Sequence, residues 1–491
     1  MKILIATPEA VPYIKTGGLA DVAGALCREL REVNCEARLI LPLYRKIRET
    51  VPSLEESGIT IKVPVGRWAL EGKVFRDDKG NYFLACDDFF DREEPYGTSS
   101  GDYADNAARF VFFSRGIIEA CRALNFRPDI IHCNDWQTGL VPLYLTTLYS
   151  SDALFRDTAT VLSIHNLGYQ GLFPPSEMPL TNLGWSLFAP EGIEFYGKVN
   201  FLKAGILAAD ILTTVSETYA KEILEREHGF GLEGLLRVRE RDIYGVINGI
   251  DYREWDPSND AFLPAAFHSG NIAGKSVCKK DLMYSLFGKT DKRELTRVPL
   301  LGMVGRLSSQ KGLSLVFQSI PEILSSGAKM VVLGKGDEKY HKGLLMLQER
   351  YSERISVTIG FDDSLAHRIY AGTDFFLMPS QYEPCGLGQL ISLRYGSIPV
   401  ARRTGGLADT IRDFEPLASR GTGFLFTDYT PSAFFDALKR AFCVFTDSRK
   451  MHRMITEGMQ QDFSWRNSVE RYCGLYRQAL EKKKSMSARV H

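Results

Sequence analysis

Short apolar runs alternate with longer amphipathic stretches along most of the chain. In its first half the apolar runs lie at residues 2–7, 128–135, 158–166 and 211–216, and amphipathic stretches that predict helices lie at 19–30 and 136–148. Continuous apolar strands are typical of parallel sheets whose two faces are covered by helices. The alternation therefore predicts right-handed βαβ units in a doubly wound α/β fold.

The pattern lapses once and then restarts. Residues 249–274 are polar and contain proline, and five further apolar runs follow at 299–307, 328–336, 354–360, 374–380 and 397–402. We expect an N-terminal Rossmann-like domain (1–248), a linker or hinge (249–274), a C-terminal Rossmann-like domain (275–462), and a C-terminal helix with a basic tail (463–491). The helix could pack on either half, and the tail is expected to be solvated. Ligands should bind at the carboxyl ends of the strands, between the two halves.

Composition narrows the class of partner. The chain has 491 residues, enough for two domains with a full core each, and its 60 basic and 60 acidic residues cancel. No global charge favours nucleic acid or a membrane surface as partner. The first apolar run is too short for a signal peptide, and no run reaches the roughly 20 residues that span a bilayer. Nine cysteines are scattered without metal-ligand spacing, which favours a reduced cytoplasm.

One six-residue string occurs twice. Thr16–Asp21 and Thr404–Asp409 both read TGGLAD, each follows a predicted strand, and each is preceded by a base, Lys15 or Arg403. The string is neither a spaced G-x-G-x-x-G nor a Walker loop. Paired glycines let a backbone approach a ligand, and the helix beyond offers free N–H groups. Either loop alone could be turn chemistry, but the matched pair favours a bound diphosphate.

Other polar residues follow predicted strands. Asp135 and Trp136 lie just beyond the apolar residues 128–134, and His165 lies at the end of the run at 158–166, beside glycines. A carboxylate and an indole suit a sugar, which has hydroxyls and an apolar face. The simpler alternatives are a helix cap for Asp135 and a buried or capping histidine.

The second half adds cations and a further carboxylate. Arg306, at the exit of the run at 299–307, and Lys311 lie five positions apart, and Glu383 follows the run at 374–380. The two cations could clamp a diphosphate, or they could be a solvated surface pair. The carboxylate could bind sugar hydroxyls or stabilise positive charge at a sugar carbon.

Seven motifs in order, KTGGLADV, HCNDWQT, IHN, NGID, GRLSSQKG, PSQYEPCGLGQ and TGGLADT, resemble the bacterial glycogen synthases and plant starch synthases, glycosyltransferase family 5. The resemblance covers nearly the whole chain. It implies a GT-B fold, in which two Rossmann-like domains face a central cleft. It also implies transfer of glucose from ADP-glucose to the non-reducing end of an α-1,4-glucan (glycogen or a malto-oligosaccharide), with retention of configuration and without a metal or other cofactor. A homo-oligomer is left open.

The resemblance also implies roles for individual residues. Lys15, with Gly17 and Gly18, would contact ADP-glucose, and Arg306 and Lys311 would neutralise its diphosphate. His165 would lie beside the donor glucose and Glu383 at the reacting sugar. Asp135 would lie on the acceptor side. Tyr96 and Asn248 would line the sugar pocket, and Gly405, Gly406 and Leu407 would approach the phosphates. One feature departs from many retaining GT-B enzymes, because the second glutamate of their E-x7-E pattern is replaced by Ile391. The glycogen and starch synthase branch also lacks this glutamate, and a ribose contact from that position is left in doubt.

The chemistry is consistent with these roles. Cleavage of a glycosyl–phosphate bond places negative charge on the leaving diphosphate, and the chain has no Asp-x-Asp to hold a metal there. Lys15, Arg306, Lys311 and helix dipoles would take the metal's place. Retention needs a double displacement or attack from the leaving-group face, and we favour the second because no carboxylate pair indicates the glycosidase pattern.

Three other classes are less well supported. An oxidoreductase would need a G-x-G-x-x-G after the first strand, which the chain lacks. A phosphorylase would need a lysine in a pyridoxal-phosphate context, and none is evident. A glucan-binding or regulatory protein without activity would not need the complete set of candidate residues.

Overall fold

The computed structural model describes residues 1–98, 101–288, 295 and 297–490, with side chains to residue 485. The chain divides into two compact units. The first comprises Met1–Val215, Ala220–Val246 and Trp465–His491, and the second comprises Ser216–Tyr219 and Ile247–Ser464. Residues 249–274, which the sequence predicts to be a linker, thus lie within the second unit.

A nine-stranded sheet forms the centre of the first unit. Its strands are β1 (Lys2–Ala6), β2 (Glu36–Pro42), β3 (Glu55–Val65), β4 (Trp68–Arg76), β5 (Tyr82–Ala85), β8 (Ile130–Asn134), β9 (Ala159–Ile164), β13 (Ile211–Thr214) and β14 (Ile243–Gly245). Their spatial order is β14-β13-β9-β8-β1-β2-β5-β4-β3. The four apolar runs predicted as buried strands correspond to β1, β8, β9 and β13, and all of these pair in parallel with their neighbours.

The edge of this sheet differs from the predicted parallel pattern. β3, β4 and β5 pair antiparallel. Ile61, Val63 and Val65 are buried on β3 while Lys62 between them is exposed. Alternation of this kind marks a strand with one solvated face, which an antiparallel edge allows. The sequence reading, based on continuous apolar runs, missed this hairpin.

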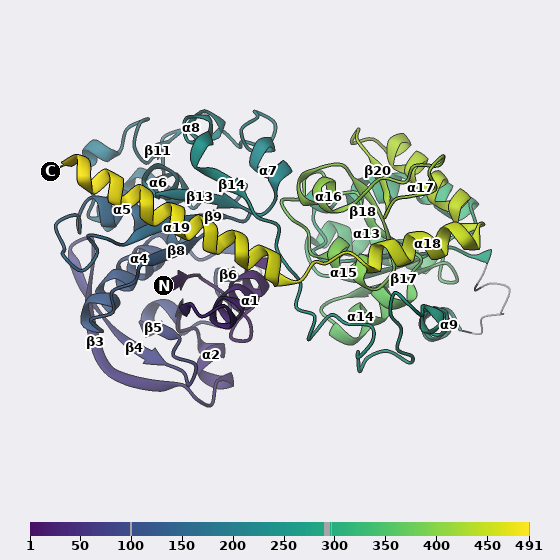
Figure 1. Ribbon diagram of the computed structural model, residues 1–491, viewed down its shortest axis with the longest axis horizontal. Helices are drawn as coiled ribbons and strands as arrows, with labels where there is room; N and C mark the ends of the chain where they lie inside the picture. The colour runs from purple at the N-terminus through teal and green to yellow at the C-terminus, as the bar shows by residue number, and fades with distance from the viewer. Residues whose placement is uncertain (99–100, 289–294, 296, 491) are drawn as a thin grey trace. The chain divides into compact units, whose positions relative to one another are not determined.

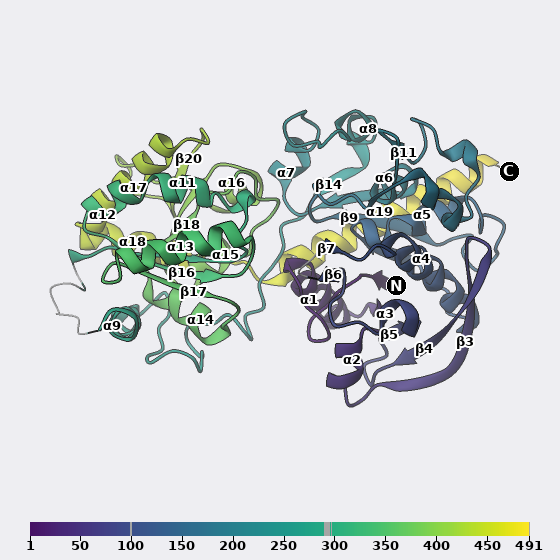
Figure 2. The same ribbon diagram turned by 180° about the vertical axis from the view of Figure 1, so that it is seen from behind.

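Helices cover both faces of the first sheet. They are α1 (Gly18–Glu32), α2 (Arg45–Thr50), α3 (Asp87–Phe90), α4 (Asn106–Ala123), α5 (Leu140–Thr146), α6 (Phe201–Ala208), α7 (Glu217–Glu222, which begins in the second unit), α8 (Glu233–Val238) and α19 (Trp465–Val490). α1 buries Leu19, Val22, Leu26 and Leu30, a spacing that forms one apolar face. α19 contacts α1 and β9 and crosses the face turned to the viewer in Figure 1, while α4 and α5 lie on the opposite face, seen in Figure 2.

Short elements complete this unit. They are the 3-10 helices η1 (Trp136–Thr138), η2 (Pro175–Thr181), η3 (Trp185–Leu187) and η4 (Glu240–Asp242), the pair β6 (Gly97–Thr98) and β7 (Gly101–Asp102), and a small sheet of β10 (Leu172–Phe173), β11 (Glu194–Phe195) and β12 (Lys198–Asn200). The predicted helix at 136–148 is therefore divided into η1 and α5.

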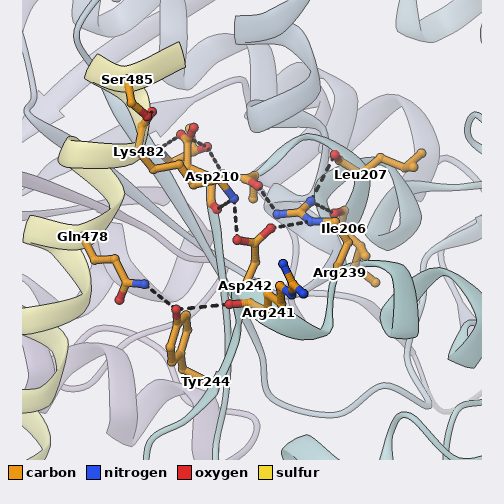
Figure 3. A network of polar contacts seen from close by, with 12 residues as sticks. Ile206, Leu207, Asp210, Arg239, Arg241, Asp242, Tyr244, Gln478, Lys482 and Ser485 are labelled. Carbon is orange, nitrogen blue, oxygen red and sulfur yellow. Dashed lines mark hydrogen bonds and ion pairs between the residues drawn. The ribbon is translucent and has the colours of Figure 1, made fainter.

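Side chains of α19 anchor it to the edge of the first sheet (Figure 3). Lys482 Nζ lies 2.5 Å from Asp242 Oδ1 and donates to the Asp210 carbonyl at 2.8 Å. One turn earlier, Gln478 donates to the Tyr244 hydroxyl. The expectation that the basic tail is only solvated is therefore wrong at Lys482, because its ammonium links the helix to the residues that immediately precede β14 and β13.

The second unit has a six-stranded parallel sheet. Its strands are β15 (Leu300–Val304), β16 (Lys329–Gly334), β17 (Ile355–Ile359), β18 (Phe375–Met378), β19 (Ile398–Arg402) and β20 (Phe424–Phe426), in the order β17-β16-β15-β18-β19-β20. Its helices are α9 (Ala273–Phe287), α11 (Leu313–Gln318), α12 (Ile320–Ser325), α13 (Glu338–Arg350), α14 (Asp363–Gly372), α15 (Gly388–Arg394), α16 (Gly405–Thr410), α17 (Pro431–Phe445) and α18 (Ser448–Met459), together with η5 (Ser309–Lys311). The five predicted strands are all present, so the doubly wound class is confirmed in both units.

Candidate active site

Each sheet has a point where the chain reverses its direction of winding. In the first unit β1 has β2 on one side and the later strand β8 on the other. In the second unit β15 lies between β16 and the later strand β18. Open α/β sheets bind ligands at the carboxyl ends of the strands that flank such a switch point. The Lys15 loop and Asp135 follow β1 and β8, while Lys311 and Glu383 follow β15 and β18, so the predicted residues lie at the switch points of their own units.

A buried glutamate holds the first TGGLAD loop. Glu9 Oε2 accepts hydrogen bonds from the Thr16 backbone N–H at 2.5 Å and from the Thr16 hydroxyl at 2.7 Å. Burial raises the pKa of the Glu9 carboxyl, while the bonds from Thr16 and Gly17 act in the opposite direction. Gly17 precedes α1 and Gly18 begins it. Lys15 Nζ lies 2.8 Å from Asp21 Oδ1, and its side chain is half-exposed.

Asp135 and His165 form one hydrogen-bonded unit. Asp135 Oδ1 accepts from the His165 backbone N–H at 2.7 Å, and His165 Nε2 lies 2.9 Å from Asn134 Oδ1. The Asn134 amide nitrogen donates to the carbonyls of Ala6 and His132, so its oxygen must act as acceptor. His165 therefore carries its proton on Nε2, which leaves Nδ1 as a base or acceptor.

Burial disfavours the charged forms of both Asp135 and His165. It raises the pKa of Asp135 to about 7, against the hydrogen bonds from His165 and Asn166 that lower it. It lowers the pKa of His165 to about 4. At neutral pH the imidazole is therefore uncharged and the carboxyl is poised between its two forms.

The backbone of Asp135 is strained. Its φ of 55° and ψ of −170° lie in a region that is essentially restricted to glycine. The Asp135 N–H donates to the Ser163 carbonyl at 2.9 Å, which ties the strained residue to the end of β9. Such conformations persist where the surrounding structure enforces them, and they cluster at functional sites.

Tyr96 lies close to this cluster. Burial raises the pKa of its hydroxyl well above the usual value, and the charge of Glu9 adds to the effect. The Tyr96 hydroxyl, the Tyr44 hydroxyl and Arg109 Nη2 are buried polar atoms that make no hydrogen bond to any residue that the structure describes. Buried polar atoms are normally paired, so this region can accept a polar ligand.

In the second unit the loops after β15 and β18 are joined. Lys311 Nζ lies 2.5 Å from Glu383 Oε2, which also accepts from the Ser380 hydroxyl at 3.0 Å. Glu383 is 5% exposed. Gln381 N donates to the Gln310 carbonyl at 2.8 Å. The ammonium and carboxylate are thus fixed side by side, which the sequence reading, with separate roles for the two, did not anticipate.

The second TGGLAD string packs against the Glu383 loop. A methyl group at Gly405, whose φ is 44°, would lie 2.0 Å from the Glu383 carbonyl oxygen, and one at Gly406 would lie 2.0 Å from that of Cys385. The glycine pair therefore allows a close approach of protein backbone. Leu407 is fully buried, so its side chain serves the core. A phosphate contact from these three residues stays a prediction.

Two other predicted residues lie near these loops. Asn248 is 5% exposed, and its Oδ1 has no hydrogen-bond partner within the described part of the chain. Hydrogen bonds from Asn248 to Cys385 oppose the rise that burial causes in the pKa of this thiol, to about 12. Arg306 is exposed at the end of β15. The structure thus brings Asn248, Lys311 and Glu383 to one edge of the second sheet, with Arg306 at its rim.

Sequence reasoning missed Glu9 and Ser380. Both follow a strand at a switch point, Glu9 three residues after β1 and Ser380 two residues after β18. Their position just after a switch-point strand is the sequence signal that could have identified them.

The described residues contain no metal-binding cluster, no membrane-spanning helix and no disulfide. No group of three or more His, Cys, Asp or Glu side chains is placed to hold a metal ion. No helix in the described ranges is both long and apolar enough to cross a membrane. The nine cysteines, all within these ranges, are free thiols.

Comparisons with known proteins agree with this architecture. The family model described as the starch synthase catalytic domain matches residues 2–238, and that of glycosyl transferases group 1 matches residues 289–461. The catalytic domain of starch synthase IV from Arabidopsis thaliana, solved with ADP and acarbose, has a TM-score of 0.88 and 31% identity, covering 98% of this chain and 99% of that one. Two Rossmann-like sheets with charged loops at their switch points thus define a glycosyltransferase of the GT-B type.

The curated relatives narrow the class. The glycogen synthase of Syntrophotalea carbinolica is 47% identical over 98% of this chain and 99% of its own, and that of Geotalea daltonii is 46% identical over 98% and 100%. The chain belongs to the glycogen synthase family.

Proposed function

We propose that the protein extends glycogen or a malto-oligosaccharide by transferring glucose from ADP-glucose to the non-reducing end, with retention of configuration. The observation that carries the proposal is the Lys311–Glu383 pair at the switch point of the second sheet. It provides a cation for a leaving diphosphate and a carboxylate for a sugar that becomes positive as its bond breaks. The ADP and acarbose bound to the similar plant enzyme support this choice of donor and acceptor.

In this proposal Lys15 acts from the first unit, and Arg306 and Lys311 act from the second, on one donor diphosphate. The acceptor hydroxyl attacks from the leaving-group face, and the departing phosphate oxygen takes its proton. Asp135 and the neutral His165 hold the sugar hydroxyls on the acceptor side and beside the donor glucose. Tyr96 and Asn248 complete the sugar pocket.

The donor test compares ADP-glucose with UDP-glucose, with glycogen as acceptor. We expect glucose incorporation and ADP release with a clear preference for ADP-glucose. Preference for UDP-glucose, or incorporation from neither donor, would overturn the proposal.

The missing Asp-x-Asp supports metal independence, so activity should survive exhaustive EDTA treatment. A loss of activity that micromolar Mg²⁺ or Mn²⁺ restores would contradict it.

The role of Lys15 has its own test. A diphosphate contact made in both ground and transition state appears in KM. We expect Lys15→Gln to raise the donor KM more than about tenfold relative to any loss of kcat, roughly 1.4 kcal/mol. Asp21→Asn is the matched control, since it removes the negative charge that lies beside Lys15 but keeps the ammonium. Normal ADP binding by Lys15→Gln in calorimetry would rule out the contact.

The balanced charge and free thiols support a cytoplasmic enzyme, and a homo-oligomer stays a prediction. Neither affects the assignment of the site.

A further inference from the structure

Three buried polar side chains of the first unit, Tyr13, Asp77 and Asn81, are joined to one another by hydrogen bonds. They are 4%, 4% and 2% exposed. The Tyr13 hydroxyl donates to Asp77 Oδ2 and accepts from Asn81 Nδ2 at 2.7 Å. Asn81 also donates to Asp77, from its backbone N–H to Oδ1 at 2.8 Å and from Nδ2 to Oδ2 at 3.0 Å. We call these three residues the tyrosine anchor.

The turn between β4 and β5 supplies two members of the tyrosine anchor. Asp77 follows β4 and Asn81 precedes β5, and the Asp77 N–H donates to the Asn81 carbonyl at 3.2 Å. Asn81 Oδ1 accepts from Arg31 Nη2 on α1 at 2.6 Å and from the Leu39 N–H on β2 at 3.0 Å. Tyr13 is therefore bonded to a turn that is itself fixed to a helix and a strand of the unit.

The Tyr13 hydroxyl is not needed for packing of its ring. The ring lies edge-to-face on Phe83, with centroids 5.1 Å apart. Burying a phenol and a carboxylate costs free energy that their hydrogen bonds offset, and apolar residues of similar volume are often as stable. A fully bonded polar network adds a single fixed geometry. Burial raises the pKa of the Tyr13 hydroxyl, and the bond to Asp77 adds to the rise, so the proton that makes this bond is retained.

The chain is held on both sides of Lys15. Tyr13 is two residues before it, and Thr16, which directly follows it, donates twice to Glu9 Oε2. The Lys15 side chain is itself 51% exposed. The backbone at Lys15 is thus fixed by the tyrosine anchor and by Glu9, while its ammonium can reach a ligand.

We propose that Tyr13, held by Asp77, is a positioning residue for Lys15 and keeps its loop placed so that the ammonium meets the donor diphosphate. This inference rests on the proposed function, which supplies the diphosphate. A preorganised cation loses less conformational freedom on binding than one on a mobile loop. The tyrosine anchor acts in the ground state and the transition state alike. Its loss should therefore appear in the donor KM and in ADP affinity rather than in kcat.

Tyr13→Phe tests the proposal, because it keeps the ring and removes the bond to Asp77. We expect its donor KM and its Kd for ADP to rise about fivefold, the scale of one hydrogen bond. Its kcat and its KM for glycogen should stay within about twofold of wild type. Tyr144→Phe is the matched control, since Tyr144 is fully buried on α5 and donates to the Thr181 carbonyl at 3.1 Å. It removes a buried tyrosine hydroxyl that is bonded to another part of the unit, so ADP affinity should not change.

A double-mutant cycle separates positioning of Lys15 from a general loss of structure. In the Lys15→Gln background the ammonium is absent, so adding Tyr13→Phe should change the Kd for ADP by less than about twofold. Melting temperatures of all variants report any loss of the fold. Calorimetry with ADP needs no turnover, so it decides the inference even if wild type transfers glucose from neither donor and the proposed function fails. The inference is wrong if wild type does not bind ADP, if Tyr13→Phe binds it as wild type does, or if the loss is the same in both backgrounds.

Discussion

Lys311 and Glu383 are 72 residues apart in sequence, and their side chains meet at 2.5 Å. This ion pair changes how the effect of a substitution at either residue should be interpreted. Removing the carboxylate releases the cation that is proposed to bind the diphosphate, and removing the cation leaves a carboxylate that is 5% exposed without its counter-charge. Substitutions that keep the shape of the side chain are therefore more informative than truncation.

We expect Glu383→Gln to lower kcat by about 10², the scale of losing one electrostatic stabiliser, and to change the donor KM only a few-fold. The amide oxygen can still accept from Ser380. Lys311→Met, which keeps most of the side-chain length without the charge, should raise the donor KM more than about tenfold and lower the free energy of unfolding by about 1–2 kcal/mol. Initial rates against ADP-glucose at saturating glycogen, with urea unfolding, measure both changes. Lys335→Ala, at an exposed lysine after β16, is the control. A near-wild-type kcat for Glu383→Gln would make Glu383 only a loop residue.

Asp135 should make stability depend on pH. Its pKa in the folded protein is raised to about 7 from an ordinary value of 3.8. The folded state thus holds a proton that the unfolded state has already released, and stability falls as pH rises from about 4 to about 7. His165, whose pKa is lowered to about 4, acts in the opposite direction up to pH 6.5.

Asp135→Asn isolates the first effect, because the variant retains His165. We expect its melting temperature relative to wild type to increase steadily from pH 4 to pH 7 and then to level off. Differential scanning fluorimetry across this range, with rates at pH 7 to confirm the loss of transfer, provides the measurement. A melting-temperature difference that is independent of pH would contradict a raised pKa at Asp135.

Sequence predicted the elements that are buried on both faces better than those that are not. β1, β8, β9, β13 and β15–β19 correspond to the predicted apolar runs, and burial on both faces leaves few alternatives for them, whereas β20, of three residues, was not predicted. The β3–β4 hairpin buries one face only, so its signal is alternation rather than a run.

In the candidate site too, the sequence predicts some features and not others. Strand-end positions led to the prediction of Asp135, His165, Lys311 and Glu383, because the carboxyl ends of parallel strands are where ligands bind; the structure places all four at such ends, and their roles stay predictions. The contacts among them were not predictable. The close approach of the glycine pair at 405–406 to the Glu383 loop depends on how two loops from different strands pack, and local sequence does not encode this distance.

The anchor of α19 can be tested at the element scale. We expect Lys482→Ala to lower the free energy of unfolding by about 1 kcal/mol, because its ion pair and its hydrogen bond to Asp210 are both partly exposed. Lys484→Ala removes an exposed lysine two residues later and should be neutral. Urea unfolding gives the energies, and the rate of tryptic cleavage within residues 465–490 reports release of the helix. Equal stability of the two variants would show that the anchor contributes nothing measurable.

At the scale of the whole molecule, the proposed donor contacts come from both units. Lys15 belongs to the first unit, and Arg306 and Lys311 belong to the second. One nucleotide sugar can meet both sets only in a definite arrangement of the units, so donor binding should select that arrangement from those that the chain can adopt. The chain passes between the units four times, at Val215–Ser216, Tyr219–Ala220, Val246–Ile247 and Ser464–Trp465, and a hinge would have to act at these crossings.

We therefore expect the radius of gyration from small-angle scattering to fall when ADP and an acceptor analogue are added together. Lys15→Gln is the matched control, because it leaves the fold intact but weakens the contact from the first unit, so its radius should change less at the same ADP concentration. The comparison must be made at saturation, which calorimetry establishes for each protein. If the wild-type radius is unchanged although ADP is fully bound, the diphosphate is held by one unit alone. In that case Lys15 would have to act on something other than the donor.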